Sequence, residues 1–151
     1  MDDVSIDIKG GENVAIVGQN GAGKTTTVKM INGLLRPTKG DVLVGDMNTK
    51  DYTTAQVSRI VGYVFQNPDD QLFSASVYQD ISFGAVNMGL PSEEVHRRVN
   101  VVMEQIGITY LKDRPTHSLS FGQKKRVAFA GIMVMQPEVI ILDEPTAGLD
   151  P

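Results

Sequence analysis

The sequence predicts an α/β fold with a mostly helical insert over residues 72–135. Two short aliphatic runs, residues 14–17 and 139–142, are rich in β-branched side chains and are typical of buried strands in a parallel sheet. Residues 25–35 carry apolar side chains at spacings of three, four and seven, which places them on one face of a helix. With 151 residues, the chain is long enough for one domain with a hydrophobic core.

A glycine-rich loop joins the first predicted strand to the first predicted helix. Residues 18–25 read GQNGAGKT and match the phosphate-binding pattern G-x-x-x-x-G-K-[ST]. Glycines let the backbone adopt positive φ angles and approach phosphate groups, and the helix N-terminus favours their negative charge. We therefore expect Lys24 to bridge the β- and γ-phosphates of a nucleoside triphosphate and the Thr25 hydroxyl to ligate Mg²⁺.

The remaining elements are predicted from local patterns along the chain. Pro68 disfavours a helical backbone at Asn67, so the segment after residue 65 is expected to be a loop. Pro91 is followed by a serine and two glutamates, which is typical of a helix start. Strands are predicted at residues 40–44 and 60–65, helices at 53–59, 77–88, 92–106 and 120–135, and a loop at 107–119. The aromatic residues beside the first insert helix, Phe73, Tyr78 and Phe83, are expected in the core.

Two acidic residues, Asp143 and Glu144, follow the last predicted strand. An open α/β sheet places its ligand chemistry at the carboxyl ends of its strands. Asp143 suits a Mg²⁺ ion that keeps much of its hydration, and Glu144 suits the orientation and deprotonation of an attacking water. Taken alone, the pair is more simply explained as a polar strand end. The phosphate loop elsewhere in the chain favours the catalytic interpretation.

Two further polar features each allow two interpretations from the residues alone. Ser120 and Gln123 form a capping box, so residues 119–123 could simply start a helix. A capped helix N-terminus is also a surface that binds phosphate, and the two interpretations are compatible. Gln66 lies in a polar loop just after a strand, where its amide either reaches a metal ion or water or is merely solvated.

Composition excludes several classes of protein. The net charge of −4 and the pI near 5.1 argue against a general nucleic-acid-binding surface, and residues 124–126 form the only basic triplet. Without cysteine there is no disulfide or thiolate metal site. The acidic first residues are unlike a signal peptide. The longest apolar stretch, residues 128–135, is far too short to span a membrane, so any membrane role is expected to involve a partner protein.

Together these motifs resemble the nucleotide-binding domain of ATP-binding-cassette (ABC) proteins, in the order of that family. The matching segments are residues 18–25 for Walker A, Gln66 for the Q-loop, 119–123 for the signature, 139–144 for Walker B with its glutamate, and 147–150 for the D-loop. The resemblance implies a RecA-like P-loop NTPase core with a mostly parallel sheet and a small antiparallel β region. Residues 1–71 and 136–151 would form that core, and residues 72–135 a helical subdomain that includes the signature helix.

The resemblance also implies an ATP site shared by two such domains. Catalysis is assigned to Glu144, Gln66 and Lys24, and Mg²⁺ binding to Thr25, Gln66 and Asp143. The expected ATP contacts within one protomer are Gly18, Gln19, Asn20, Gly21, Ala22, Gly23, Lys24, Thr25 and Thr26. The expected contacts from the second protomer are Ser120, Gly122, Gln123 and Asp150. Phe121 stands where the signature more usually has glycine.

A finer resemblance is to the ATPase subunits of cobalt, nickel and energy-coupling-factor vitamin importers. It lies in residues 65–73 (FQNPDDQLF) and 119–126 (LSFGQKKR). It implies ATP hydrolysis that powers import through an integral membrane subunit, by a homodimer or heterodimer of ATPases located in the cytoplasm at the inner face of the cell membrane, with no nucleic-acid partner. The alternatives are a non-transport ABC ATPase, or a chain that binds nucleotide without turnover.

Three features of the family have no counterpart in the sequence. They are the aromatic residue that stacks on adenine, the switch histidine, and the strand that leads to this histidine between the Walker A and Walker B strands. We therefore expect the sequence to be a fragment of a longer subunit. Loss of that strand would leave unpaired backbone groups in the middle of the sheet, and the fragment alone is expected to turn over ATP poorly or not at all.

Overall fold

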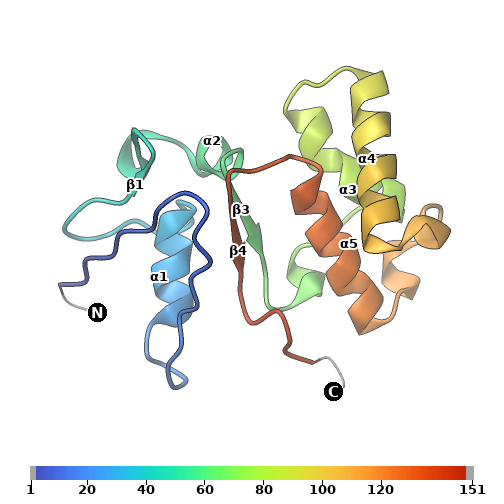
Figure 1. Ribbon diagram of the computed structural model, residues 1–151. Coiled ribbons are helices and arrows are strands. Elements are labelled where there is room, and N and C mark those ends of the chain that lie inside the picture. The colour runs from blue at the N-terminus through green and yellow to red at the C-terminus, as the bar shows by residue number, and fades with distance from the viewer. Residues whose placement is uncertain (1–2, 149–151) are drawn as a thin grey trace.

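The computed structural model describes residues 3–148, and two groups of elements flank a central pair of strands (Figure 1). On one side lie α1 (Lys24–Ile31), β1 (Leu43–Val44), β2 (Met47–Asn48) and α2 (Thr54–Ser58). The central strands are β3 (Val61–Val64) and β4 (Val139–Leu142). The other side holds α3 (Val77–Asn87), α4 (Ser92–Ile106) and α5 (Phe121–Met133). Single 3-10 turns at Thr49–Asp51, Pro68–Asp70, Thr109–Leu111 and Thr116–Ser118 lie between these elements.

Two small sheets are present in the described chain. β3 and β4 run parallel, with Val61 opposite Val139 and Tyr63 opposite Ile141. β1 and β2 form an antiparallel pair on the side of α1. The predicted combination of a parallel core, a small antiparallel region and a helical insert is confirmed. Because β4 follows β3 by more than seventy residues, the insert lies between two strands that are neighbours in space.

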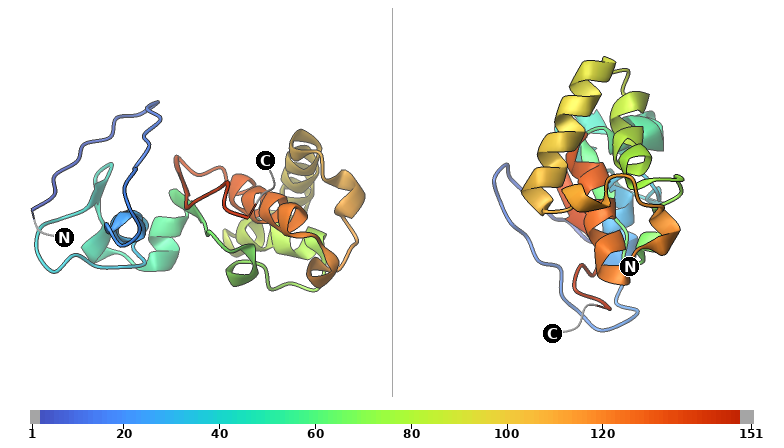
Figure 2. Two further views of the ribbon diagram at one scale, coloured as in Figure 1. Left: turned by 90° about the horizontal axis from the view of Figure 1, so that it is seen from below. Right: turned by 90° about the vertical axis from the view of Figure 1, so that its right-hand side faces the viewer.

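The three long helices of the insert share one hydrophobic core, and both views of Figure 2 show them lying together. Ile81 of α3, Met103 of α4 and Val127 of α5 are almost completely buried in it. A second, smaller core joins the central strands to α1 and α2, with Val57 and Val61 fully buried. No helix within residues 3–148 combines the length and the apolar character that crossing a membrane requires.

The strand predicted at residues 14–17 is wrong. This segment forms no ladder with any described strand, and the side chain of Val17 is 88% exposed. The edge of β4 that faces away from β3 has no described strand partner either, and Val139, Ile140 and Leu142 are partly exposed. Since a strand is stabilised by ladder hydrogen bonds to a neighbour, the apolar pattern of residues 14–17 does not suffice to form one here.

Other boundaries differ from the predictions for local reasons. The strand predicted at residues 40–44 is present only as Leu43–Val44. α1 ends at Ile31 rather than residue 35 because Gly33 adopts a φ of +78°, a left-handed conformation that stops the helix.

The prediction that Phe73 and Phe83 lie in the core is wrong, since they are 65% and 45% exposed, with ring centroids 4.6 Å apart. Tyr78 does pack against the helical core.

Candidate functional site

The glycine-rich loop leads directly into α1, as its sequence predicts. Gly21 and Gly23 have φ angles of 81° and 91°, which side chains with a Cβ rarely adopt. Gly23 is the N-cap of α1 and has no side chain to bond the free N–H groups of the first helical turn. These groups therefore stay available to an anion, and the helix dipole adds positive potential at the same place.

The ammonium group of Lys24 lies inside this loop. Its Nζ donates hydrogen bonds to the carbonyl oxygens of Gly18 and Gln19, at 2.7 and 3.0 Å. The cation is therefore held over the segment in which phosphate is expected. Both partners are neutral carbonyls, so a phosphate group can replace them as the stronger, charged acceptor.

Thr25 and Asp143 come together although they are 118 residues apart in the sequence. The Thr25 hydroxyl donates a hydrogen bond of 3.3 Å to Oδ1 of Asp143. A hydroxyl and a carboxylate are hard oxygen ligands of the kind that Mg²⁺ prefers. Residues 3–148 contain no cluster of three or more His, Cys, Asp or Glu that would form an all-protein cage. The donor set thus fits a Mg²⁺ ion that takes most of its ligands from water and phosphate.

Tyr63 is a member of this site that the sequence interpretation missed. Its hydroxyl donates a hydrogen bond of 2.7 Å to Oδ2 of Asp143. Burial, followed by this hydrogen bond and the negative charge of the carboxylate, raises the pKa of Tyr63. Side chains alternate between the two faces of a strand, and this alternation explains the contact. Tyr63 pairs with Ile141, and Asp143 lies two residues after Ile141 and hence on the same face.

Glu144 lies beside the phosphate loop and is bonded to Gln66. The Gln66 amide, through Nε2, donates a hydrogen bond of 2.9 Å to Oε2 of Glu144. Glu144 adopts a φ of 47°, an uncommon left-handed conformation for a residue with a Cβ. A cavity of about 230 Å³ is lined by Asn20, Gly21, Gly23, Lys24, Thr25, Thr26 and Glu144. The structure therefore joins the predicted phosphate loop and the predicted catalytic glutamate in one polar cavity.

The signature segment forms the capping box that its sequence predicts. Ser120 Oγ accepts from the backbone N–H of Gln123, and Gln123 Oε1 accepts from the backbone N–H of Ser120. Within the described chain, the residues lining the phosphate-loop cavity do not include Ser120, Gly122 or Gln123. Asp150, the fourth residue expected to act across a dimer interface, lies outside the described residues. Of the ATP contacts expected within one protomer, the lining includes Asn20, Gly21, Gly23, Lys24, Thr25 and Thr26 but not Gly18, Gln19 or Ala22.

Comparisons with known proteins identify relatives along nearly the whole chain. The family model described as "ABC transporter" matches residues 1–147. Energy-coupling factor transporter ATP-binding protein EcfA3 of Clostridium perfringens is 56% identical over 98% of this chain and 53% of its own length. Energy-coupling factor transporter ATP-binding protein EcfA of Methanocaldococcus jannaschii is 52% identical over 98% of this chain and 54% of its own length. The chain therefore spans about half the length of these curated relatives.

Solved structures show the same fold. The structure of cbiO1 from Clostridium perfringens, described as part of the ABC transporter complex cbiONQ, superposes with a TM-score of 0.78 at 56% identity. The match covers 89% of this chain and 55% of that one. A dimeric ATP-binding cassette in a post-hydrolysis state with bound ADP and Pi superposes with a TM-score of 0.84 at 27% identity. That match covers 96% of this chain and 66% of the other.

Proposed function

This chain belongs to the ABC transporter family of ATP-binding domains, and on that premise we propose that it carries an ATP hydrolysis site. One observation carries the proposal: Glu144 lines the same cavity as Lys24 and Thr25. Residues 18–26 would bind the phosphates of ATP, chiefly through backbone N–H groups and the Lys24 ammonium. Thr25 and Asp143 would hold Mg²⁺, with Gln66 as a third expected ligand. The bound ion would neutralise charge on the transferred phosphoryl group.

Glu144 is the proposed general base. Its carboxylate would orient a water molecule toward the γ-phosphate and accept a proton as the water attacks. The hydrogen bond from Gln66 supports this role because it holds one carboxylate oxygen, Oε2, and leaves Oε1 for the water. Lys24 would leave the carbonyls of Gly18 and Gln19 and bond the β- and γ-phosphates, where charge increases during the reaction.

A second ABC protomer would complete the site. Ser120, Gly122, Gln123 and Asp150 of that protomer are the proposed contacts, since the first three do not line the cavity within the described part of this chain. The dimeric cassette with ADP and Pi among the structural relatives supports this arrangement. The second protomer is either an identical or a related ATPase. Residues 1–71 and 136–151 would act as the nucleotide-binding core and residues 72–135 as the helical subdomain.

The proposed task of the intact subunit is to power import of cobalt, nickel or a vitamin through an integral membrane partner at the cytoplasmic face of the membrane. The names of the energy-coupling factor relatives and of the cbiONQ complex support this class of transport. The exposed aromatic pair Phe73 and Phe83 supports a contact between the helical subdomain and another protein. The net charge of −4 supports the proposed absence of a nucleic-acid partner.

ATP turnover by the intact subunit that contains this sequence tests the proposal. Glu144→Gln should lower kcat by roughly 10²- to 10⁴-fold, because the amide cannot accept the proton, while ATP binding is retained. Glu138→Gln, just before β4, is the matched control. Binding of ATP without Glu144-dependent hydrolysis would favour the alternative of a nucleotide-binding module. Hydrolysis without association with a membrane subunit would favour a non-transport ABC ATPase.

A further inference from the structure

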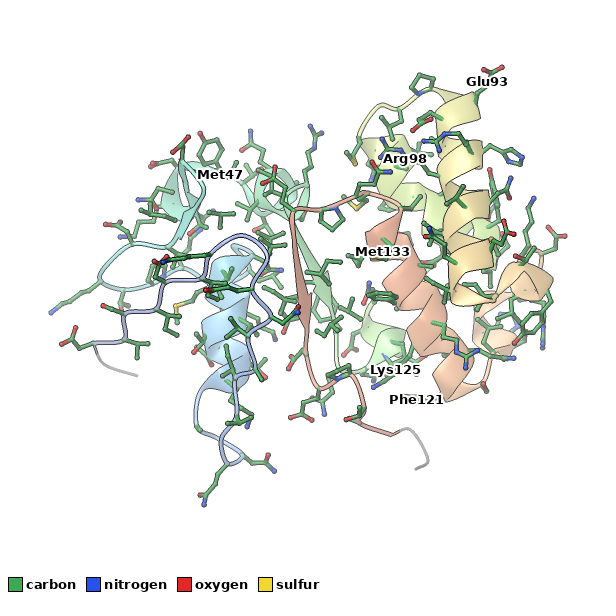
Figure 3. The ribbon with its side chains drawn as sticks, in the orientation of Figure 1. Met47, Glu93, Arg98, Phe121, Lys125 and Met133 are labelled. Carbon is green, nitrogen blue, oxygen red and sulfur yellow. The ribbon has the colours of Figure 1, made fainter. Side chains whose placement is uncertain are left out.

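Lys125 makes an unusual set of contacts with the segment that follows β4. It lies near the start of α5, and its Nζ donates to three backbone carbonyl oxygens: Pro145 at 3.1 Å, Ala147 at 2.6 Å and, more weakly, Glu144 at 3.3 Å. Figure 3 labels Lys125 at the lower end of α5, beside this segment. Through these hydrogen bonds, the lysine connects the signature helix, α5, to the backbone segment that carries Glu144.

The backbone at Glu144 needs such support. Its φ of 47° is an uncommon conformation for a residue other than glycine and persists only where the surroundings stabilise it. The turn is closed by a 3.0 Å hydrogen bond from Ala147 N to Glu144 O, and its carbonyl groups converge on one side. Three carbonyl dipoles that point at one another repel, and an ammonium group placed between them turns that repulsion into attraction.

The Phe121 side chain makes a second contact between α5 and the segment after β4. Its ring lies 5.3 Å from Lys125 Nζ, and Figure 3 labels both residues near the N-terminal end of α5. A Cβ on Gly148 would lie only 2.7 Å from Cε1 of Phe121, so the ring packs directly on the Gly148 backbone. The residue that departs from the usual glycine of the signature therefore fills a defined place against the segment after Glu144.

We infer that Lys125 is a positioning residue for Glu144: it fixes the backbone of residues 144–147 from the signature helix, while Gln66 fixes the Glu144 side chain. The inference rests on the proposed catalytic role of Glu144. In the expected dimer, α5 contacts the nucleotide bound by the second protomer, whereas Glu144 acts on the nucleotide bound by its own protomer. Lys125 would therefore connect the two ATP sites directly. A displacement of α5 would then move Glu144 without a change in the phosphate loop.

The test compares three variants of the intact subunit. Lys125→Met keeps the length of the side chain and removes its charge and donors. Lys125→Arg keeps the positive charge and the hydrogen-bond donors. It should retain most of the activity, because the guanidinium can also donate to several carbonyls. Lys124→Met is the matched control: this neighbouring lysine, whose Nζ lies 2.6 Å from Asp69 Oδ1, makes no hydrogen bond to residues 144–147 within the described chain.

Lys125→Met should lower kcat by roughly 10- to 100-fold, as expected for a misplaced catalytic group, with KM and ATP affinity nearly unchanged. A second readout does not depend on turnover: in the nucleotide-free protein, amide hydrogen exchange at Ala147, whose N–H donates to Glu144 O, should become at least about tenfold faster. Lys124→Met should change neither quantity.

Unchanged kcat and unchanged exchange in Lys125→Met would overturn the inference. Equal losses in the methionine and arginine variants would also contradict it, since the donors would then not matter. If the unmodified subunit does not hydrolyse ATP at all, the proposed function fails. The exchange measurement then still decides whether Lys125 holds this segment.

Discussion

The hydroxyl group of Tyr63 lies 2.7 Å from Oδ2 of Asp143 and connects the two central strands at their carboxyl ends. The other carboxylate oxygen, Oδ1, accepts from the Thr25 hydroxyl at 3.3 Å. Both oxygens are therefore oriented by neutral hydroxyl donors, one from β3 and one from α1. Both donors are uncharged hydroxyls, so neither competes electrostatically with a cation for the carboxylate.

Tyr63→Phe should weaken metal binding. Loss of a hydrogen bond that orients a ligating carboxylate typically lowers metal affinity by about 10- to 100-fold. We expect a change near the lower limit, because Thr25 still bonds the other oxygen. The measurement is Mn²⁺ binding in the presence of ATP, followed by electron paramagnetic resonance. Tyr78→Phe removes a hydroxyl bonded to His96 instead and is the matched control. Equal Mn²⁺ affinity in both variants would contradict the role of Tyr63.

Lys24→Ala should weaken ATP binding by roughly 10- to 100-fold. In the proposed complex the ammonium of Lys24 would donate charge-assisted hydrogen bonds to phosphate, which are worth about 1.5–3 kcal/mol. Titration with a fluorescent ATP analogue measures the change. Lys29→Ala, in the last turn of the same helix, removes the same charge away from the loop and should bind ATP normally. If both variants lose affinity equally, net charge rather than the loop geometry explains the effect.

Gly62→Ala should destabilise the fold by about 1–3 kcal/mol through overpacking. A Cβ at this position of β3 would collide with Cγ2 of Ile132 and lie 3.2 Å from Cγ of Pro137. Urea denaturation measures the free energy of unfolding. Gly10→Ala is the control, because a Cβ there meets nothing within 4 Å, and its effect should stay below about 0.5 kcal/mol. A neutral Gly62→Ala variant would mean that α5 can shift away from the sheet without loss.

The Glu94 carboxylate should make stability depend on pH in the acid range. Hydrogen bonds from Arg97 and then Arg98 lower the pKa of Glu94 from 4.5 to about 2. Because the folded state holds this group deprotonated, its contribution is complete above about pH 4.5 and is lost as the pH falls toward 2. The difference in unfolding free energy between the parent protein and Glu94→Gln should therefore shrink over that range. Urea denaturation at several pH values tests this, and a difference that stays constant would refute it.

Elements with local signals could be predicted from the sequence closely. α4 begins and ends at the predicted residues, because Pro91 and the acidic first turn mark its start and Gly107 marks its end. β4 also has its predicted bounds, since its four aliphatic residues are followed at once by two acids. The segment at residues 14–17 has the same kind of pattern, but strand formation depends on a neighbour elsewhere in the chain, which the pattern does not contain.

In the candidate site too, residues in local motifs could be predicted from the sequence, and residues defined by distant contacts could not. The phosphate loop, Asp143 and Glu144 have recognisable local motifs, and the structure brings them together. Lys125 looks like one more charge of a basic triplet, and its role depends on contacts 19 to 22 residues away. No periodic pattern marks such contacts. Tyr63 lies on the face of Asp143 through the register of β3 with β4, which the local sequence pattern does not contain.

The pairing of β3 with β4 therefore does more than bury apolar side chains. A slip of one residue between these two strands would turn Tyr63 to the opposite face and leave Asp143 without that partner. The same slip would move the Gln66 amide by about 3.3 Å relative to Glu144, more than the length of the bond that joins them. The alignment of two four-residue strands thus sets the positions of the residues beyond their ends, and an error in it would displace the proposed metal ligand, Asp143, and the proposed base, Glu144, together.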